Sequence, residues 1–436
     1  MTIYDVGIIG GGASGMAAAI CSARAGARVL VLERMERTGK KILATGNGRC
    51  NLGNRRLSQS KGAAEQVYRS RQEGFAKQVL DRFSPGDVSD FFSSIGIQVV
   101  SRDGYLYPAS MQASAVRDAL EWAALETGRV DIRTGVCVLQ AEKNGETGAA
   151  AGWISSGQSM FVLSGDDSSR YYCRRLILAA GGMSSPKLGS DGSGFRLCKA
   201  FGHNMITPVP ALCALRCEGA FFKEIAGVRA RGRISLIQDG KVAASDEGEL
   251  QFTSYGVSGI PVFQISRYAS YALKKSGSVM VSADLFPDRK KGWIRTYLME
   301  QAASHPAYTM EMILHGVMNS KLADALCKMA GCRECAAEKW EAGRIEDLCS
   351  LLKGLRASVT GTQGFDNSQV TAGGADTREV DPYTLSSRLV PGLYLSGEIL
   401  DVDGICGGYN LCWAFAGGCL AGKSAAQSLQ SQGEMR

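Results

Sequence analysis

The amino-terminal residues combine a strand, a glycine-rich turn, a helix, a second strand and an acidic residue within about 30 positions, the size of one βαβ unit. Ile3 to Ile9 is predicted to form a short buried strand, and Gly10-Gly11-Gly12-Ala13-Ser14-Gly15 follows it. An alanine-rich helix ended by Gly26 comes next, and then a strand from Arg28 to Leu32 that Glu33 closes. This order is typical of a dinucleotide-binding unit. It predicts a Rossmann-like α/β fold.

Each part of this motif has a physical role in holding a pyrophosphate. Gly10 permits the tight turn, Gly12 lets the backbone approach the phosphates, and Gly15 lets the helix pack on the strand. The helix N-terminus offers unpaired N–H groups and a partial positive charge. A carboxylate at Glu33 can accept both hydroxyls of a ribose and would repel a 2′-phosphate, which predicts FAD or NAD. The expected cofactor residues here are Gly10, Gly12, Ala13, Ser14, Gly15, Glu33 and Arg34.

The composition excludes several other classes of protein. Glycine contributes 54 of the 436 residues, but it follows no Gly-X-Y period and only ten prolines accompany it, which excludes collagen and disordered linkers. Only three histidines are present, which argues against a histidine-based metal centre, and we expect no metal. A net charge of +7 over this length indicates at most a mild preference for anionic ligands, and we expect no nucleic-acid partner.

Two uncharged runs, Val6 to Ala23 and Gly404 to Gly422, approach the length of a membrane span. Several glycines interrupt each run, so neither is apolar enough to be a good span or signal peptide. The 14 cysteines are scattered and follow no secretory signal, which predicts reduced thiols in a cytoplasmic protein. Cys332-x-x-Cys335 could form a zinc site with Cys327 and Cys349, but the irregular spacing favours thiols in or near a helical core.

A second glycine-rich and basic loop, Thr38 to Asn51, favours FAD over NAD, because it could run along a bound cofactor. Gly392 to Glu398 is predicted to be a strand ending in an acid that could bind the ribityl chain. The apolar helix opened by Gly407-Gly408-Tyr409-Asn410 could face the N1/O2 edge of a flavin. Arg175 to Leu178 is predicted to be a buried strand that ends beside the cofactor. These segments add Gly39, Lys40, Lys41, Thr45, Gly46, Gly48, Asn51, Val138, Ala180, Gly181, Gly182, Gly397, Glu398, Asp401, Gly408, Tyr409, Asn410 and Leu411 to the expected cofactor site.

Several motifs occur in a recognisable order along the chain. They are Gly10–Gly15, Gly39-Lys40-Lys41, Thr45–Asn51, Phe252–Gly259, and Gly397–Gly404 with Gly407–Asn410. The set resembles a bacterial family of FAD-dependent oxidoreductases that includes the gut bacterial 3-dehydro-bile acid Δ4,6-reductase and an aminoacetone oxidase. The resemblance covers nearly the whole chain. It implies a two-dinucleotide-binding-fold FAD domain, built from both ends of the chain and interrupted by a β-rich insert with a helical piece.

The interior pattern divides the chain in the same way. From about His203 the alternation of helix and strand gives way to short β-prone runs, including a hairpin signal at Asp239-Gly240. Helix-forming residues follow, and Thr360 to Gly374 is expected to form glycine-rich loops. The expected domains are an FAD-binding domain at 1–200 and 356–436, a β-rich insert at 201–287 and a helical part at 288–355.

The resemblance implies reduction of the conjugated C=C bonds of 3-oxo-4,6-diene or 3-oxo-4-ene bile acids. Such a reaction needs a donor to the developing enolate oxygen and a general acid. Tyr255, Tyr105 and Tyr107 are the candidates, and Tyr105 stands where many relatives carry a basic residue, which suggests altered substrate choice. The partner is then a small molecule, an acidic steroid or its CoA thioester. With one dinucleotide fingerprint in the chain, NAD(P)H would be a transient electron donor. An oxygen-using amine oxidase and a non-catalytic flavoprotein remain alternatives, and the oligomeric state stays open.

Two further groups of polar residues have a structural and a functional interpretation. Arg229, Arg231 and Arg233 recur at period two, so they would emerge from one face of a strand. A solvated sheet face is favoured, and an anion site for an acidic substrate is the alternative. A packed or surface position is favoured over catalysis for His203.

Overall fold

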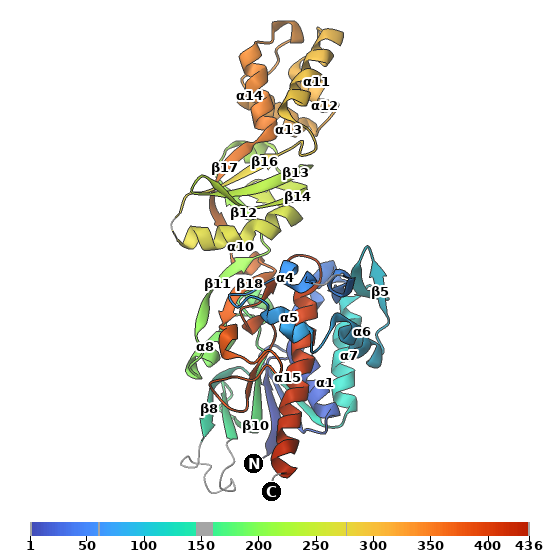
Figure 1. The fold of residues 1–436 in the computed structure, drawn as a ribbon, viewed down its shortest axis with the longest axis vertical. Coiled ribbons are helices and arrows are strands. Elements are labelled where there is room, and N and C mark those ends of the chain that lie inside the picture. Colours follow the sequence, from blue (N-terminus) through green and yellow to red (C-terminus); the bar gives the residue numbers. More distant parts are fainter. Residues whose placement is uncertain (1, 60–61, 145–159, 276, 435–436) are drawn as a thin grey trace. The chain divides into compact units, whose positions relative to one another are not determined.

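The computed structural model describes residues 2–59, 62–144, 160–275 and 277–434, and the chain divides into two compact units (Figure 1). Unit 1 comprises Met1–Pro208 and Val370–Arg436, and unit 2 comprises Val209–Gln369. The chain leaves unit 1 through strand β11 (Met205–Ala211) and returns through β18 (Val370–Ala375), and these two strands pair with each other. Both ends of the chain therefore build unit 1.

Unit 1 is organised around a seven-stranded sheet in the order β7-β2-β1-β10-β9-β8, with β19 pairing to β10. Strands β7, β2, β1, β10 and β19 run parallel, whereas β9 pairs antiparallel with both β10 and β8. Every residue of β2 is buried, as expected for a parallel strand covered on both faces. The strands are β1 (Ile3–Ile9), β2 (Val29–Glu33), β7 (Val130–Thr134), β8 (Val138–Asn144), β9 (Met160–Gly165), β10 (Arg170–Leu178) and β19 (Leu393–Leu395).

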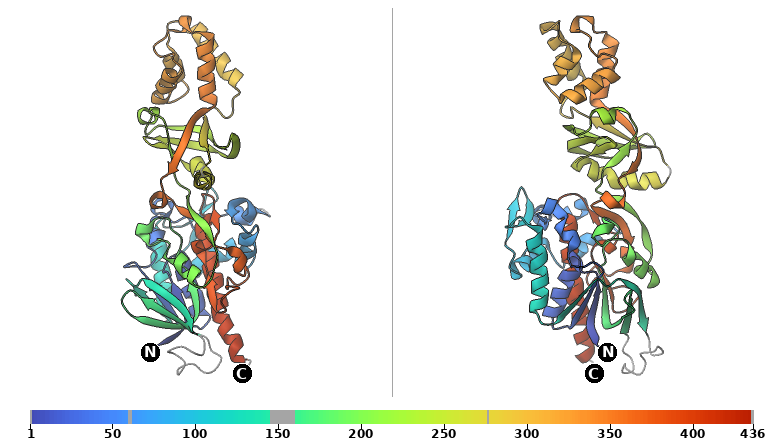
Figure 2. Two further views of the ribbon diagram at one scale, coloured as in Figure 1. Left: turned by 90° about the vertical axis from the view of Figure 1, so that its left-hand side faces the viewer. Right: turned by 180° about the vertical axis from the view of Figure 1, so that it is seen from behind.

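Helices α1 (Ala13–Arg24) and α15 (Tyr409–Glu434) lie side by side in unit 1 (Figure 2). A side chain at Gly418 would overlap the carbonyl oxygen of Ser14, and one at Gly422 would overlap that of Ala18. The helices therefore run in the same direction with their backbones in contact. The Ser22 hydroxyl reinforces this contact by donating to the Gly422 carbonyl at 2.9 Å.

Shorter elements complete unit 1. A three-stranded sheet has the order β3-β6-β5, and β4 pairs with β20. These strands are β3 (Gly53–Asn54), β4 (Tyr68–Arg69), β5 (Val99–Arg102), β6 (Tyr105–Pro108) and β20 (Asp403–Gly404). The helices are α2 (Lys40–Leu43), α3 (Arg56–Gln59), α4 (Ala63–Val67), α5 (Phe75–Leu80), α6 (Pro85–Ser94), α7 (Ala113–Glu126) and α8 (Ser193–Ala200).

Unit 2 contains a closed barrel in the order β12-β15-β14-β13-β16-β17, together with five helices longer than one turn. The strands are β12 (Leu215–Cys217), β13 (Arg229–Gln238), β14 (Lys241–Thr253), β15 (Gly256–Ser258), β16 (Val279–Asp284) and β17 (Leu355–Thr362). The helices are α10 (Ile260–Lys274), α11 (Lys291–Ser304), α12 (Met310–His315), α13 (Ser320–Met329) and α14 (Ala342–Lys353), with α9 (Phe221–Glu224) as a single turn.

The elements expected at both ends of the chain are confirmed, and so is the Rossmann-like fold class. Strand β1 has the predicted bounds, and β2 begins one residue later than predicted. The β13–β14 hairpin turns at Asp239 and Gly240, which both have positive φ, as the Asp-Gly signal predicts.

The expectation of loops throughout Thr360 to Gly374 is wrong, because β17 and β18 occupy much of this range. A Cβ atom on Gly373 would lie 2.6 Å from the Thr207 oxygen, and one on Gly374 would lie 2.7 Å from the Ile399 oxygen. Glycine marks close backbone approach at these two positions rather than a loop.

His203 is part of a buried hydrogen-bond network, which confirms its packed position. Its Nε2 lies 2.9 Å from the Ser387 hydroxyl, and its Nδ1 lies 3.2 Å from a Glu379 oxygen. The Ser387 hydroxyl accepts the N–H groups of Leu389 and Val390, so its own proton is directed to Nε2. Nδ1–H then donates to Glu379, and His203 is neutral. Burial lowers the pKa of His203, which the Glu379 carboxylate opposes.

This network makes folding sensitive to acid. The folded state holds His203 neutral, whereas the unfolded state takes up a proton below about pH 6.5, so stability present above that pH is lost as pH falls. We expect wild type to lose up to about 1.4 kcal/mol per pH unit from this group below that point, and His203→Gln to lose less. Thermal unfolding at pH 7.5 and 5.5 measures the difference. His315→Gln, which replaces an exposed histidine, is the control; an equal loss in both variants contradicts the prediction.

The four cysteines that could form a zinc site belong to unit 2. Cys327, Cys332 and Cys349 are buried in the core of unit 2, which confirms the helical-core interpretation. In the part of the chain that the structure describes, no three metal-ligating side chains gather into a cluster. None of the described helices combines the length and apolar character of a bilayer-crossing segment.

Candidate cofactor site

The glycine-rich turn after β1 has the close contacts that its motif predicts. Gly10 has a φ of 103°, and a Cβ there would lie 2.5 Å from the Ala179 oxygen at the end of β10. A Cβ on Gly15 would overlap the Gly10 carbonyl oxygen. Gly12 is different, because a Cβ there would meet no atom within 4 Å. Gly10 and Gly15 are thus required by the protein itself, whereas Gly12 faces open space.

The N-terminus of α1 at Gly12 is open and could receive a phosphate. Gly12 is the N-cap of α1, no side chain caps the helix, and its first turn carries no acidic residue. The first N–H groups of α1, which Ala13 and Ser14 begin, therefore remain available to an anion. The Ser14 hydroxyl lies 2.7 Å from that of Ser396, just before Gly397. This contact joins the glycine-rich turn to the expected flavin segment, 382 residues apart in sequence.

Glu33 holds the same turn in shape. One carboxylate oxygen accepts the Gly11 N–H at 2.7 Å, and the other accepts the Met35 N–H at 2.8 Å. Burial raises the pKa of Glu33, and these two backbone donors oppose the shift. Each oxygen keeps a lone pair for a ribose hydroxyl, so the ribose role predicted for Glu33 stays compatible with this structural one.

Arg34 forms an ion pair with Asp191 in a second glycine-rich segment, Gly189 to Gly194. Burial raises the pKa of Asp191, but the Arg34 guanidinium and the Ser193 N–H outweigh it and lower the pKa to about 2. A Cβ on Gly189 would lie 3.1 Å from the Met35 side chain. The segment from Gly189 to Gly194 is therefore packed against Arg34 and Met35.

Lys41 and Glu398 meet although 357 residues separate them, with Nζ and Oε2 2.8 Å apart. The other Glu398 oxygen accepts the N–H of Thr371 at 2.8 Å. The Thr371 hydroxyl accepts the Met183 N–H at 2.8 Å, beside Gly182, where a Cβ would lie 2.5 Å from this hydroxyl. Sequence reasoning missed Thr371, which lies among residues expected to be loop; the Gly373-Gly374 pair after it was the available signal.

Residues 45–51 form a loop with left-handed backbone at Gly46, Asn47, Gly48 and Cys50. Two N–H groups of this loop are paired within it, because Arg49 donates to the Gly46 carbonyl oxygen and Cys50 to the Thr45 carbonyl oxygen, each at 3.2 Å. Asn51 closes the loop. Its amide nitrogen donates to the Gly53 carbonyl oxygen at 2.8 Å, and its amide oxygen accepts the Gly408 N–H at 3.2 Å. Gly408 must be glycine, because a side chain there would overlap Asn51.

The segment before α15 is held by its own side chains. Asn410 accepts the Gly404 N–H at 2.7 Å and donates to the Gly404 carbonyl at 2.9 Å. Tyr409 is buried, its carbonyl accepts the Tyr68 hydroxyl, and burial raises its side-chain pKa. Asp401 is also buried and accepts the Arg71 N–H at 2.8 Å, so this side chain supports the backbone. Leu411 is half-buried against the core.

The remaining expected cofactor residues lie in unit 1. Ala180, Gly181 and Gly182 follow β10, and Gly181 has a φ of 74°. Gly39 is the left-handed N-cap of α2, which begins at Lys40, and the Lys40 amine pairs with Glu36. Thr45 donates to the Ile42 carbonyl, and Val138 begins β8.

The three candidate tyrosines separate into two groups. Tyr105 and Tyr107 lie two residues apart on β6 of unit 1, so they share one face of that strand. A Cβ on Gly407 would lie 3.3 Å from the Tyr105 ring, which places Tyr105 against the segment before α15. Tyr255 belongs to unit 2, in the turn between β14 and β15, and is exposed.

The arginines at period two form a solvated face, as favoured from the sequence. Arg229 pairs with Glu249 at 3.0 Å, and both Arg231 and Arg233 pair with Glu247 at 3.0 Å. The three side chains are 62%, 68% and 49% exposed. Carboxylates thus already neutralise the positions that an acidic substrate would need, which argues against the anion-site alternative.

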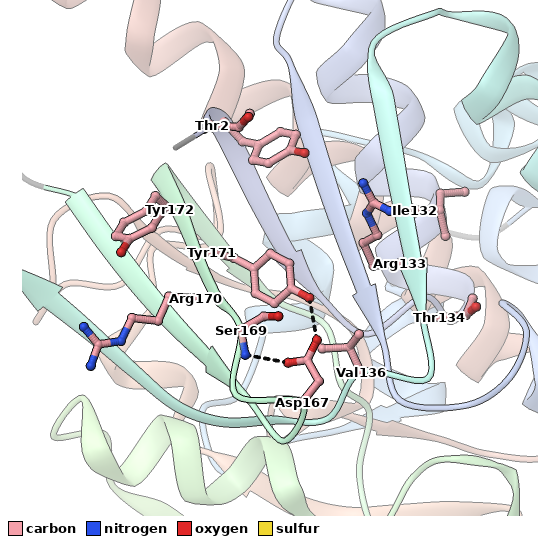
Figure 3. A pocket seen from close by; sticks show the side chains of 11 residues that line it. Thr2, Ile132, Arg133, Thr134, Val136, Asp167, Ser169, Arg170, Tyr171 and Tyr172 are labelled. Atoms are coloured by element: carbon pink, nitrogen blue, oxygen red, sulfur yellow. Dashed lines mark hydrogen bonds between the residues drawn. The ribbon is translucent and has the colours of Figure 1, made fainter.

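A cavity of about 630 Å³ lies along β1, β7 and β10 in unit 1 (Figure 3). Arg133, Tyr171 and Asp167 line it, and Asp167 accepts both the Ser169 N–H and the Tyr171 hydroxyl. Its lining includes none of the expected cofactor residues or candidate tyrosines, so it is not the predicted cofactor site.

Known proteins similar to this chain share its sequence over nearly its whole length or share its fold. Residues 4–424 match the family described as HI0933-like protein Rossmann domain. The 3-dehydro-bile acid delta(4,6)-reductase of Clostridium scindens is 42% identical over 425 residues, covering 97% of this chain and 99% of that protein. The ribosomal RNA dihydrouridine synthase of Escherichia coli is 32% identical over 420 residues, covering 95% and 96%. The 3-ketosteroid delta1-dehydrogenase structure from Sterolibacterium denitrificans shares the fold, with a TM-score of 0.53, 13% identity and coverage of 98% and 100%.

Proposed function

Because this chain belongs to the HI0933-like Rossmann-domain family, we propose that it is an FAD-dependent reductase of carbon–carbon double bonds conjugated to a carbonyl group. An acidic 3-oxo-4-ene or 3-oxo-4,6-diene steroid of the bile-acid type is the proposed substrate. The observation that carries the proposal is the 42% identity to the Clostridium scindens reductase over 97% of this chain, which includes both ends of the cofactor site.

The residues described above fit FAD in defined places. The open N-terminus of α1 at Gly12 would hold the pyrophosphate, and Glu33 would bind the adenosine ribose. Lys41, Glu398 and the loop at 45–51 would follow the middle of the cofactor. The N-terminus of α15 at Tyr409 would face the flavin edge.

Bound FAD would supply the hydride that the electron-poor end of the enone accepts. The chain itself must hold the carbonyl and move a proton. Tyr105 or Tyr107 would donate a hydrogen bond to the oxygen on which negative charge develops. A tyrosine hydroxyl would protonate the adjacent carbon. NAD(P)H would act as a transient electron donor.

A second candidate substrate is a uridine in RNA, since the Escherichia coli relative is a ribosomal RNA dihydrouridine synthase. The 5,6 double bond of uracil is also conjugated to a carbonyl, so the same hydride and proton transfers would saturate it. This candidate departs from the sequence-based expectation of no nucleic-acid partner. The lower identity, 32% against 42%, places it second.

One experiment distinguishes these candidates. The FAD-loaded protein is reduced anaerobically and mixed separately with a 3-oxo-4-ene bile acid, an unmodified ribosomal RNA fragment and oxygen. We expect rapid return of oxidised flavin absorbance with the bile acid, and a product heavier by two hydrogen atoms. A response to RNA alone supports the second candidate, and a response to oxygen alone supports an oxidase. Purified protein that binds no FAD would contradict every flavin-based assignment.

A further inference from the structure

Two arginines lie beside the segment before α15. The guanidinium of Arg49 lies 5.7 Å from the centroid of the Tyr107 ring, within cation–π range. Burial raises the pKa of Tyr409, and the positive charge of Arg56 opposes this rise. Both arginines are exposed. They therefore approach, from the solvent side, the tyrosines nearest to the proposed flavin edge.

Asn54 connects these residues to the segment before α15. Its Nδ2 donates to the Gly407 carbonyl at 3.2 Å, and its Oδ1 accepts the Arg56 N–H at 3.0 Å. Asn54 also pairs with Tyr105 between β3 and β6. We use the name arginine–tyrosine patch for the group that results: Arg49, Arg56, Tyr105 and Tyr107.

The cations of this patch have neutral partners. Arg56 donates to the Gln66 amide oxygen at 3.0 Å, and Arg49 donates to the Gly46 carbonyl at 3.2 Å. Among the residues that the structure describes, neither guanidinium takes part in an ion pair with a carboxylate within 4 Å. The arginines on β13 differ, because Glu247 and Glu249 neutralise them. Each guanidinium of the patch keeps N–H donors in a fork that matches a carboxylate or phosphate.

We propose that Arg56, assisted by Arg49, binds the anionic group of the substrate and so positions an acidic enone at the segment before α15. This inference rests on the proposed function. The ring system would lie against Tyr105 and Tyr107, and the acid would lie at the arginines. The anion is the steroid side-chain carboxylate, or a coenzyme A phosphate if the acid arrives as its thioester; both are recognised by the same donors.

The test compares a charged substrate with its neutral counterpart. Steady-state kinetics are measured with a 3-oxo-4-ene cholanoic acid and its methyl ester, on wild type, Arg56→Gln, Arg49→Gln and the control Arg231→Gln. We expect Arg56→Gln to raise the KM for the acid about tenfold or more, the range of a charge-assisted hydrogen bond, with the ester KM and both kcat values little changed. Arg49→Gln should act in the same direction, and Arg231→Gln should leave the acid-to-ester ratio at the wild-type value. Inhibition by free coenzyme A that disappears in Arg56→Gln would identify the phosphate as the anion.

Three results would overturn the inference. Arg56→Gln could change acid and ester equally, which would indicate a structural role. It could shift the flavin midpoint potential while the acid-to-ester ratio stays, which would place Arg56 on the flavin. Arg231→Gln could produce the selective KM effect, which would place the anion site on β13. Failure of wild type to reduce either steroid contradicts the proposed function first, and the inference falls with it.

Discussion

Protein carrying Gly12→Ala is expected to fold like wild type and to purify without flavin. Gly12 has an extended backbone with φ −80° and ψ −165°, which alanine adopts without strain. A Cβ there meets no protein atom within 4 Å, so the apoprotein should lose at most about 1 kcal/mol, the order of an N-cap substitution. The same methyl group would occupy the space that the pyrophosphate needs. We expect FAD affinity to fall by about 100-fold or more, the order of an overpacked contact.

The measurement is the flavin content of purified protein together with the unfolding temperature of both apoproteins. Gly15→Ala is the matched comparison, because its Cβ would overlap the Gly10 oxygen and should destabilise the fold as well. Gly12→Ala protein that retains full flavin would place the pyrophosphate elsewhere. Gly12→Ala protein that fails to fold would show that the open space is filled by the protein.

Gly418→Val should strongly destabilise unit 1. The Cβ of residue 418 would overlap the Ser14 carbonyl oxygen and lie 3.0 Å from the Ala17 Cβ, so α1 and α15 must separate. Overpacking typically costs about 1 to 3 kcal/mol and occasionally more, and the clash here is with backbone, which cannot move aside easily. Because Ser14 is in the first turn of α1, flavin content should fall with stability.

Gly417→Ala is the control in the adjacent position. Its Cβ would lie 3.1 Å from the Ser396 hydroxyl and 3.4 Å from a Leu385 methyl group, and both can shift slightly. We expect Gly417→Ala to lower the free energy of unfolding by about 1 kcal/mol or less, which is the size of a typical single-residue substitution. Denaturant unfolding of the three proteins measures these differences. Equal stability of Gly418→Val and wild type would mean that the two helices are not in backbone contact.

This pair of variants also tests how the second glycine-rich run is understood. The sequence predicts that the helix opened by Gly407-Gly408-Tyr409-Asn410, within the run from Gly404 to Gly422, faces the N1/O2 edge of a flavin. In the structure its first part, up to Leu411, belongs to the candidate site, whereas Gly418 and Gly422 allow α15 to pack on α1. The glycine content of this run predicts close approach to its backbone, but it does not show whether a cofactor or another helix makes that approach.

The local sequence pattern was sufficient to predict the first βαβ unit and the hairpin at Asp239-Gly240. Both depend on contacts between neighbouring residues, such as the turn at Gly10 and the positive φ values at Asp239 and Gly240. The strand at Val370–Ala375 was missed because its glycines serve contacts with Thr207 and Ile399, which are distant in sequence.

The sequence by itself determined the Rossmann-like class and the glycine-rich turn after the first strand, because motif spacing and hydrophobic period act over short distances. The family resemblance implied that both chain ends build one domain. Only the tertiary structure decided which charges are paired. It joined Lys41 to Glu398 and Arg34 to Asp191, neutralised the β13 arginines with Glu247 and Glu249, and left Arg49 and Arg56 with neutral partners. Ion pairs depend on which residues lie close together in space, and the identity of an arginine in the sequence does not show whether a carboxylate lies beside it.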